Sequence, residues 1–119
     1  MSKITDFFRV EELVCQHVYE RFGDRALDFI DSRLKETLVV LREKLNRPIY
    51  INNWVWGGDK TQRGLRCNVC AIVREQTALE KPYLSAHVFG KGVDFNVKGM
   101  TAQQVLRELL QTVPAPRLR

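Results

Sequence analysis

Hydrophobic residues near the N-terminus recur at the spacing of an α-helix. The pattern predicts one helix over residues 10–22, and Gly23 then supplies a natural end. One face of this segment carries Leu13, Val14, His17 and Val18. A single continuous helix is therefore expected here.

The strongest helical pattern is a leucine stripe in the next segment. Asp31 or Ser32 can cap the start of this helix, and Asn46 and Pro48 end it. Four leucines recur between them at spacings of four, three and four residues, namely Leu34, Leu38, Leu41 and Leu45. We expect this stripe to form part of the hydrophobic core.

Two short stretches of the second half predict strands. Residues 49–52 are β-branched and aromatic up to a final asparagine, and residues 92–97 alternate between apolar and polar positions. Residues 70–75 fit either a strand or a short helix. Residues 53–67 predict a long irregular loop, and a loop of this length in a compact domain is usually functional.

A last helix is expected near the C-terminus. Thr101 and Gln104 form a capping-box pattern, and Pro114 and Pro116 would end the helix. Helices thus come first, then strands, then a helix. This order predicts an α+β fold in which helices pack on one face of a small antiparallel sheet.

Composition favours a single domain that spans residues 1–119. A chain of 119 residues with 45% hydrophobic content can build one core. No apolar run is long enough to cross a bilayer, and the N-terminus lacks the apolar region of a secretory signal. We therefore expect no membrane partner and a cytoplasmic start, with release by another route if the protein leaves the cell.

The net charge of +5 favours acidic partners in general. The basic residues are scattered, however, so most of them are expected to belong to an ordinary solvated surface, and nucleic acid is an unfavoured partner. Charge therefore identifies no partner by itself.

His87 and Asp94 form a possible metal-binding pair. They lie seven positions apart, and a glycine-rich loop between them lets the chain reverse so that imidazole and carboxylate converge on one ion. Zinc accepts both ligand types. The spacing alone is common by chance, and a surface histidine near a strand aspartate is the alternative.

The full pattern around this pair is more specific. Ser85, His87, Gly90 and Asp94 form Ser-x-His-x-x-Gly-x-x-x-Asp, which resembles the zinc motif of the D-Ala-D-Ala carboxypeptidases (peptidase family M15), whose fold and ligands the Hedgehog signalling domain shares. Gly92 stands where that family usually has alanine. The resemblance implies a Hedgehog/DD-peptidase-like fold and a zinc metallopeptidase that acts on peptidoglycan stem peptides, as a carboxypeptidase or an endolysin-type endopeptidase.

The resemblance also implies roles for individual residues. His87 and Asp94 would be two of three zinc ligands, with a later histidine as the third and a glutamate just before it as the general base. No histidine follows Asp94, so that segment would lie beyond Arg119. The zinc-bound water would attack the peptide bond, and an arginine would stabilise the carboxylate or oxyanion of the substrate.

The catalytic arginine does not stand where the family usually has it. Arg63 and Arg66 are the candidates to replace it, against the alternative that both face solvent. Ser85 and Trp56 are the candidates for substrate binding. An anchoring role in the loop is the favoured alternative for Trp56 and its neighbour Trp54.

All three cysteines and the remaining histidine form a second possible zinc site. Cys15, His17, Cys67 and Cys70 make a complete tetrahedral ligand set, and Cys-x-x-Cys is a familiar zinc spacing. Free or redox-active thiols are the alternative. A further objection is that residues two apart on a helix, such as Cys15 and His17, point to different faces unless the helix is broken there.

Three functions remain open. The first is the zinc peptidase, and the second is a catalytically degenerate cell-wall-binding or structural domain on the same fold. The third is a zinc-knuckle nucleic-acid-binding module, which leaves the motif from Ser85 to Asp94 unexplained.

Overall fold

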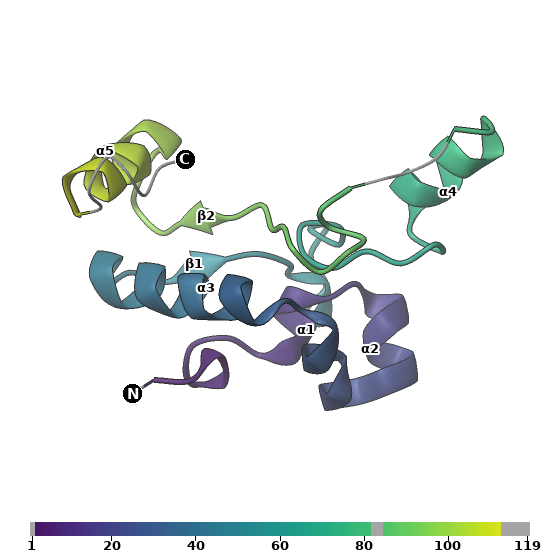
Figure 1. Ribbon diagram of the computed structural model, residues 1–119, viewed down its shortest axis with the longest axis horizontal. Helices are drawn as coiled ribbons and strands as arrows, with labels where there is room; N and C mark the ends of the chain where they lie inside the picture. Colours follow the sequence, from purple (N-terminus) through teal and green to yellow (C-terminus); the bar gives the residue numbers. More distant parts are fainter. Residues whose placement is uncertain (1, 82–84, 113–119) are drawn as a thin grey trace.

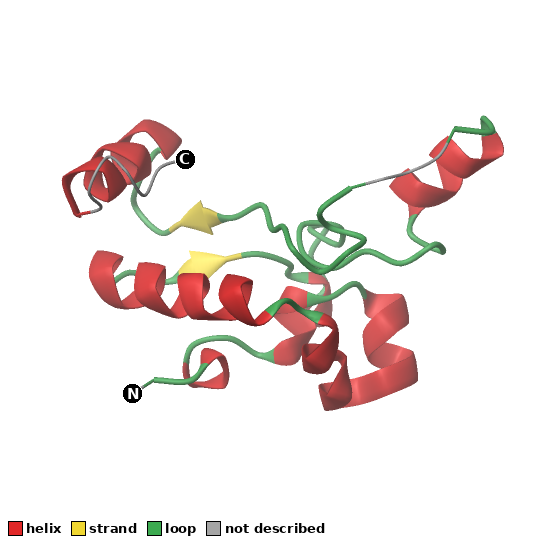
Figure 2. Ribbon diagram, viewed as in Figure 1, coloured by secondary structure: helices red, strands yellow, loops and turns green. Residues whose placement is uncertain are grey.

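The computed structural model of the protein describes residues 2–81 and 85–112, and it contains both helices and a small sheet. The described part extends over 43 × 28 × 25 Å, with α4 and α5 at opposite ends (Figure 1). Its α-helices and strands are α1 (Val10–Leu13), α2 (Gln16–Phe22), α3 (Ser32–Leu45), β1 (Ile49–Tyr50), α4 (Ala71–Ala78), β2 (Asn96–Val97) and α5 (Ala102–Thr112). Short 3-10 turns cover Ile4–Asp6, Gly23–Phe29 and Trp54–Trp56. The expected α+β class is confirmed at this level (Figure 2).

The expectation of one helix over residues 10–22 is wrong. The chain forms α1 and α2, separated by Val14 and Cys15, and the Val14 backbone is extended (φ −129°, ψ 161°). The Leu65 N–H donates to the Leu13 carbonyl at 2.9 Å, and the Cys15 N–H donates to the Leu65 carbonyl at 2.9 Å. The helix therefore breaks because a distant segment satisfies the backbone groups that an unbroken helix would pair internally.

The leucine-stripe helix is confirmed as α3. The Asp31 side chain accepts the Arg33 N–H at 2.8 Å, and Asn46 ends the helix in the left-handed conformation (φ 49°). Leu38 is 1% exposed and lies in the core. The local signals of stripe and caps were sufficient to predict this element.

The sheet consists of two antiparallel strands, with Ile49 opposite Val97 and Tyr50 opposite Asn96. Both strands are shorter than expected, and residues 92–95, including Asp94, lie outside β2. The strands end early because backbone N–H groups next to them donate to carbonyls of other segments. The Asn52 N–H bonds to the Glu12 carbonyl, and the Asp94 N–H bonds to the Arg63 carbonyl.

The two remaining helices follow the chain patterns. Residues 70–75, which fitted either structure, belong mainly to α4. Thr101 and Gln104 form the expected capping box of α5, with hydrogen bonds of 2.8 and 3.1 Å. The expected end at Pro114 and Pro116 lies outside the described residues. Within the described part, no helix is long and apolar enough to cross a membrane.

A buried asparagine joins the sheet to the loop. Asn52 is 2% exposed, its amide nitrogen donates to the Val14 carbonyl at 2.9 Å, and its amide oxygen accepts the Arg63 N–H at 2.9 Å. A buried polar side chain costs free energy unless it is paired in this way. Asn52 therefore holds the break between α1 and α2 against the segment that begins at Arg63.

We expect Asn52→Ala to lower the free energy of unfolding by about 1–3 kcal/mol, because it removes both hydrogen bonds of a buried amide and leaves the Arg63 N–H without this partner. Denaturant unfolding followed by circular dichroism measures this. Gln103→Ala removes an exposed amide from α5 and serves as the control. Equal unfolding midpoints for the two variants would contradict this role of Asn52.

Candidate metal centres

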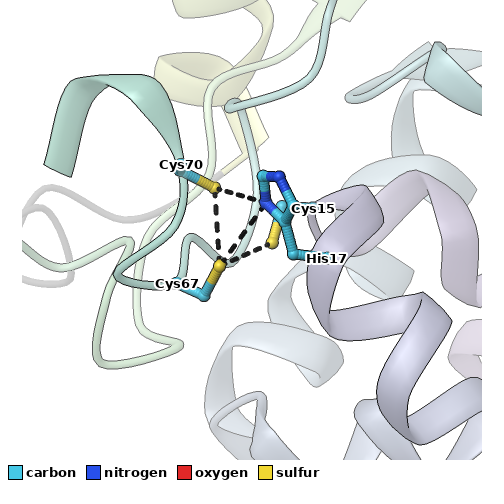
Figure 3. A group of neighbouring side chains, drawn as sticks. All are labelled: Cys15, His17, Cys67 and Cys70. Atoms are coloured by element: carbon cyan, nitrogen blue, oxygen red, sulfur yellow. Dashed lines mark hydrogen bonds between the residues drawn. The ribbon is translucent and has the colours of Figure 1, made fainter. Parts of the chain in front are cut away.

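The three cysteines and His17 lie together in one cluster, which we call the Cys/His cluster (Figure 3). The potential ligand atoms of Cys15, His17, Cys67 and Cys70 all lie within 4.8 Å of one another, so the group could hold a metal ion. The Cys67 Sγ lies 3.6 Å from the Cys15 Sγ and 3.9 Å from the Cys70 Sγ. The His17 Nδ1 lies 3.5 Å from the Cys67 Sγ and 3.7 Å from the Cys70 Sγ.

Four of the six ligand–ligand spacings fit a tetrahedral zinc site. Zn–S bonds of about 2.3 Å and Zn–N bonds of about 2.0–2.1 Å at tetrahedral angles separate two sulfurs by about 3.8 Å and sulfur from nitrogen by about 3.6 Å. The four distances that surround Cys67 and His17 agree with these values to within a few tenths of an ångström. The donor set and its geometry are therefore compatible with zinc.

The break between α1 and α2 brings Cys15 and His17 together. Cys15 is the N-cap residue of α2, with an extended backbone (φ −71°, ψ 161°), whereas His17 lies in the first turn of the helix. The objection that two helical residues at this spacing face apart therefore does not apply. Cys70 is likewise the N-cap residue of α4, so two of the three thiols stand at helix N-termini.

The thiols also influence one another. The hydrogen bond with Cys70 lowers the pKa of the Cys15 thiol to about 5, against the opposing effect of burial. The bond to Cys15, together with burial, raises the pKa of the Cys70 thiol. Without metal, Cys15 and Cys70 thus favour one thiolate between them, and a divalent cation would supply the charge needed to ionise both.

We expect Cys67→Ser to lower the zinc content of the purified protein by about one ion per chain, because a four-ligand site loses its central thiolate. Elemental analysis measures the content, and the absorbance of a cobalt-substituted sample reports the thiolate ligands. Asn68→Ser changes an exposed residue in the same turn and should retain the metal. Equal metal content in the two variants would rule out a metal at the Cys/His cluster.

His87 and Asp94, which we call the His/Asp pair, also come together. The His87 Nε2 lies 3.4 Å from the Asp94 Oδ2, and the His87 Nδ1 lies 3.0 Å from the Gly64 carbonyl oxygen. A carbonyl oxygen can only accept, so Nδ1 donates and Nε2 is the nitrogen that faces the carboxylate. Metal-binding histidines are usually held in this way by a carbonyl or carboxylate on the other nitrogen.

The spacing of the His/Asp pair fits a shared ion. Zinc bonds of about 2.0–2.1 Å to nitrogen and oxygen at tetrahedral angles place the two atoms about 3.3 Å apart. The His87 side chain is 14% exposed and that of Asp94 is 63% exposed, so the pair opens to solvent on the carboxylate side. Within the described residues, no third histidine, cysteine or carboxylate joins this pair in a metal-binding group.

The two arginine candidates take different positions. Arg66 has an 11% exposed side chain, its Nε donates to the Gln62 carbonyl at 2.6 Å, and its Nη2 lies 3.8 Å from the Asp94 Oδ2. Arg66 therefore belongs to the His/Asp site. Arg63 is one of the residues that line a neighbouring cavity with Trp56, and its carbonyl accepts the Asp94 N–H at 2.7 Å.

The remaining site candidates are placed as follows. The Ser85 Oγ accepts the His87 N–H at 3.2 Å, so it positions the loop of the pair. Trp54 has the expected anchoring role in the loop, because its indole N–H donates to the Val14 carbonyl at 2.9 Å. Trp56 is 60% exposed and does not share that role.

Gly64 and Asn52 were missed as site residues. A Cβ on Gly64 would collide with the Leu13 carbonyl, so only glycine lets this segment approach α1 closely enough to bond as it does. The available signals were a glycine between two arginines in a long loop and a polar residue at the end of an apolar strand. Neither signal indicates which distant segment Gly64 or Asn52 contacts.

Comparison of the chain with protein-family models, with curated proteins and with solved structures gave no match. The geometry of the two centres and the motif that contains the His/Asp pair are therefore the features of the chain that bear on its function.

Proposed function

We propose that this chain is a zinc metallopeptidase domain of the Hedgehog/DD-peptidase type, with helices on one face of its sheet, that acts on peptidoglycan stem peptides. The observation that carries the proposal is the approach of His87 Nε2 to Asp94 Oδ2 at 3.4 Å, with Nδ1 held by a carbonyl. These two residues are also the metal ligands of the motif that the sequence resembles. Geometry and motif therefore support the same centre independently.

Each residue of the centre has a task in this proposal. His87 and Asp94 would hold the zinc, which when bound makes a water molecule acidic enough to attack a peptide carbonyl near neutral pH. The Arg66 guanidinium is fixed beside Asp94 by its bond to the Gln62 carbonyl. A fixed cation at this position suits the carbonyl oxygen of the scissile bond, on which negative charge develops.

Zinc in the Cys/His cluster would have a structural task. Three thiolates and one imidazole fill a tetrahedral site and leave no open position for substrate, which is the usual arrangement of structural zinc. The proposal thus gives the domain two different zinc sites. The cluster holds the chain together, and the His/Asp pair carries the chemistry.

The peptidase hypothesis requires a third protein ligand for the zinc at the His/Asp pair. The resemblance places this ligand C-terminal to Asp94, and residues 2–81 and 85–112 do not contribute one to the pair. A metal held by two side chains alone binds weakly. This observation favours a second candidate, a domain on the same fold that binds peptidoglycan without cleaving it.

We expect His87→Ala to lower the rate of stem-peptide hydrolysis at least about 100-fold, because loss of even an outer-shell partner of a metal ligand commonly costs 10–100-fold. The measurement is mass spectrometry of the pentapeptide L-Ala-γ-D-Glu-L-Lys-D-Ala-D-Ala after incubation with zinc-loaded protein. Phe89→Ala, in the same turn and 57% exposed, is the matched control. Hydrolysis at the wild-type rate in His87→Ala would refute the peptidase.

The second candidate predicts retention without turnover. Purified sacculi should pellet the protein while the supernatant contains no released peptide, and His87→Ala should pellet equally well. Detection of cleaved peptides from the wild-type chain would exclude this candidate. Failure of the protein to pellet would exclude it as well.

A further inference from the structure

Two cysteine sulfurs of the Cys/His cluster lie near bonding distance (Figure 3). The Cys67 Sγ lies 3.6 Å from the Cys15 Sγ, and a disulfide bond joins two sulfurs at about 2.05 Å. Formation of this bond would therefore draw the two sulfurs together by about 1.5 Å. The Cys70 Sγ lies 3.9 Å from the Cys67 Sγ, so Cys15 is the nearer partner of Cys67.

Cys67 is the thiol of the cluster that solvent reaches. It is partly exposed, whereas Cys15 and Cys70 are each 1% exposed. A cavity of about 270 Å³ also adjoins the cluster, and Cys15, His17 and Cys70 are among the residues that line it. Hydrogen peroxide is little larger than water, which occupies about 30 Å³ in the liquid. A small peroxide can therefore approach Cys67 without unfolding of the chain.

The backbone holds Cys15 and Cys67 near each other. The Cys15 N–H donates to the Leu65 carbonyl at 2.9 Å, and Cys67 follows Leu65 by two positions. The parallel bridge between Val14 and Leu65 belongs to the same contact. Because the fold itself keeps Cys15 beside Cys67, an oxidised Cys67 meets a second thiol before it meets a second peroxide.

We infer that Cys67 is an oxidation site for hydroperoxides, that Cys15 is its disulfide partner, and that this bond regulates the His/Asp pair. The Cys67 sulfur attacks one peroxide oxygen, the O–O bond breaks, and Cys67 becomes a sulfenic acid while the other oxygen leaves as water or alcohol. The Cys15 sulfur then attacks the Cys67 sulfur and expels the hydroxyl oxygen as water. Two thiols are oxidised to one disulfide and one peroxide is reduced. The thiols supply both protons, or solvent supplies them when the sulfurs are thiolates.

The disulfide would also empty the metal site of the cluster. Zinc binds thiolates, and the two sulfurs of a disulfide have lost that charge. Cys70 and His17 would then remain as two ligands of a four-ligand site. Oxidation therefore releases a metal held by the cluster, and reduction of the disulfide restores all four ligands.

Cys67 is connected to the His/Asp pair through Arg66. The Arg66 N–H donates to the His87 carbonyl at 3.1 Å, and the Arg66 Nη2 lies 3.8 Å from the Asp94 Oδ2. Cys67 directly follows Arg66, so a displacement of Cys67 toward Cys15 would act on both contacts. Regulation of hydrolysis in this way rests on the proposed function, whereas the disulfide and its effect on His87 do not.

The disulfide is mapped first in the wild-type chain, so that the result does not depend on the folding of a variant. Trypsin leaves Cys15 in the peptide of residues 10–21, and it leaves Cys67 and Cys70 in the peptide of residues 67–74. The zinc-loaded chain is treated with hydrogen peroxide, and its remaining thiols are alkylated before digestion. We expect the two peptides to be linked through Cys67, with Cys70 alkylated, as fragment masses would show. A link to Cys70, or alkylation of all three cysteines, would overturn the inference.

Metal release should accompany the disulfide. We expect about one zinc ion per chain to be released as the linked peptides form, and dithiothreitol should restore both the thiols and zinc binding. A chromophoric chelator measures the released ion. Asn68→Ser changes the exposed neighbour of Cys67 and should respond as the wild type does. A disulfide that forms as fast in Cys67→Ser as in Asn68→Ser would overturn the role of Cys67.

The effect on the His/Asp pair is measured with zinc in excess, from the NMR signals of His87 and from hydrolysis of the stem pentapeptide. In the oxidised chain we expect the His87 signals to shift and hydrolysis to fall at least about tenfold, since a misplacement of about 1 Å can cost as much as about 100-fold. Identical His87 signals in the oxidised and reduced chains would overturn the inferred regulation. Shifted signals in a chain that hydrolyses nothing in either state would support the inference and refute the peptidase. Equal hydrolysis in both states would leave the peptidase standing and refute the regulation.

Discussion

The backbone of residues 64–66 is shared by two other parts of the chain, and both candidate metal centres depend on this sharing. Leu65 directs its N–H and carbonyl toward Leu13 and Cys15. On the other side, the Gly64 carbonyl accepts from the His87 ring and the Arg66 N–H donates to the His87 carbonyl. An extended chain presents successive peptide groups to opposite sides, so one short segment can align Cys15 with one centre and His87 with the other.

Elements with local determinants were predictable from sequence, and those with distant determinants were not. The leucine stripe and its caps define α3, and the reciprocal bonds of Thr101 and Gln104 define the start of α5. The helical period continues through Val14, yet the helix breaks there because Leu65 takes the neighbouring backbone groups. Periodicity reports what a segment can bury, but it carries no information on which distant backbone will pair with it.

The candidate sites divide in the same way. Ligand chemistry and ligand count selected the Cys/His cluster, because zinc needs particular atoms in particular number. The His/Asp pair was selected by the resemblance of the surrounding motif, because its spacing alone is common by chance. The orientation of those atoms comes from tertiary contacts, such as the carbonyl that holds the His87 ring. Arg63 and Arg66 could not be separated from sequence, since only the fold directs Arg66 toward Asp94 and Arg63 toward the cavity.

The sheet is small, and a metal cross-link would compensate for its few paired residues. Two residue pairs join β1 to β2 within residues 2–81 and 85–112, which is a small amount of strand pairing for a described part of this size. A metal in the Cys/His cluster would join Cys15 to Cys67 across 52 positions, and constraining so long a loop removes much of the freedom of the unfolded chain. Cys67 directly follows Arg66, so the same cross-link would restrain the guanidinium beside Asp94. A fold with little strand pairing could in this way hold the His/Asp pair, which opens to solvent on the Asp94 side, in a fixed geometry.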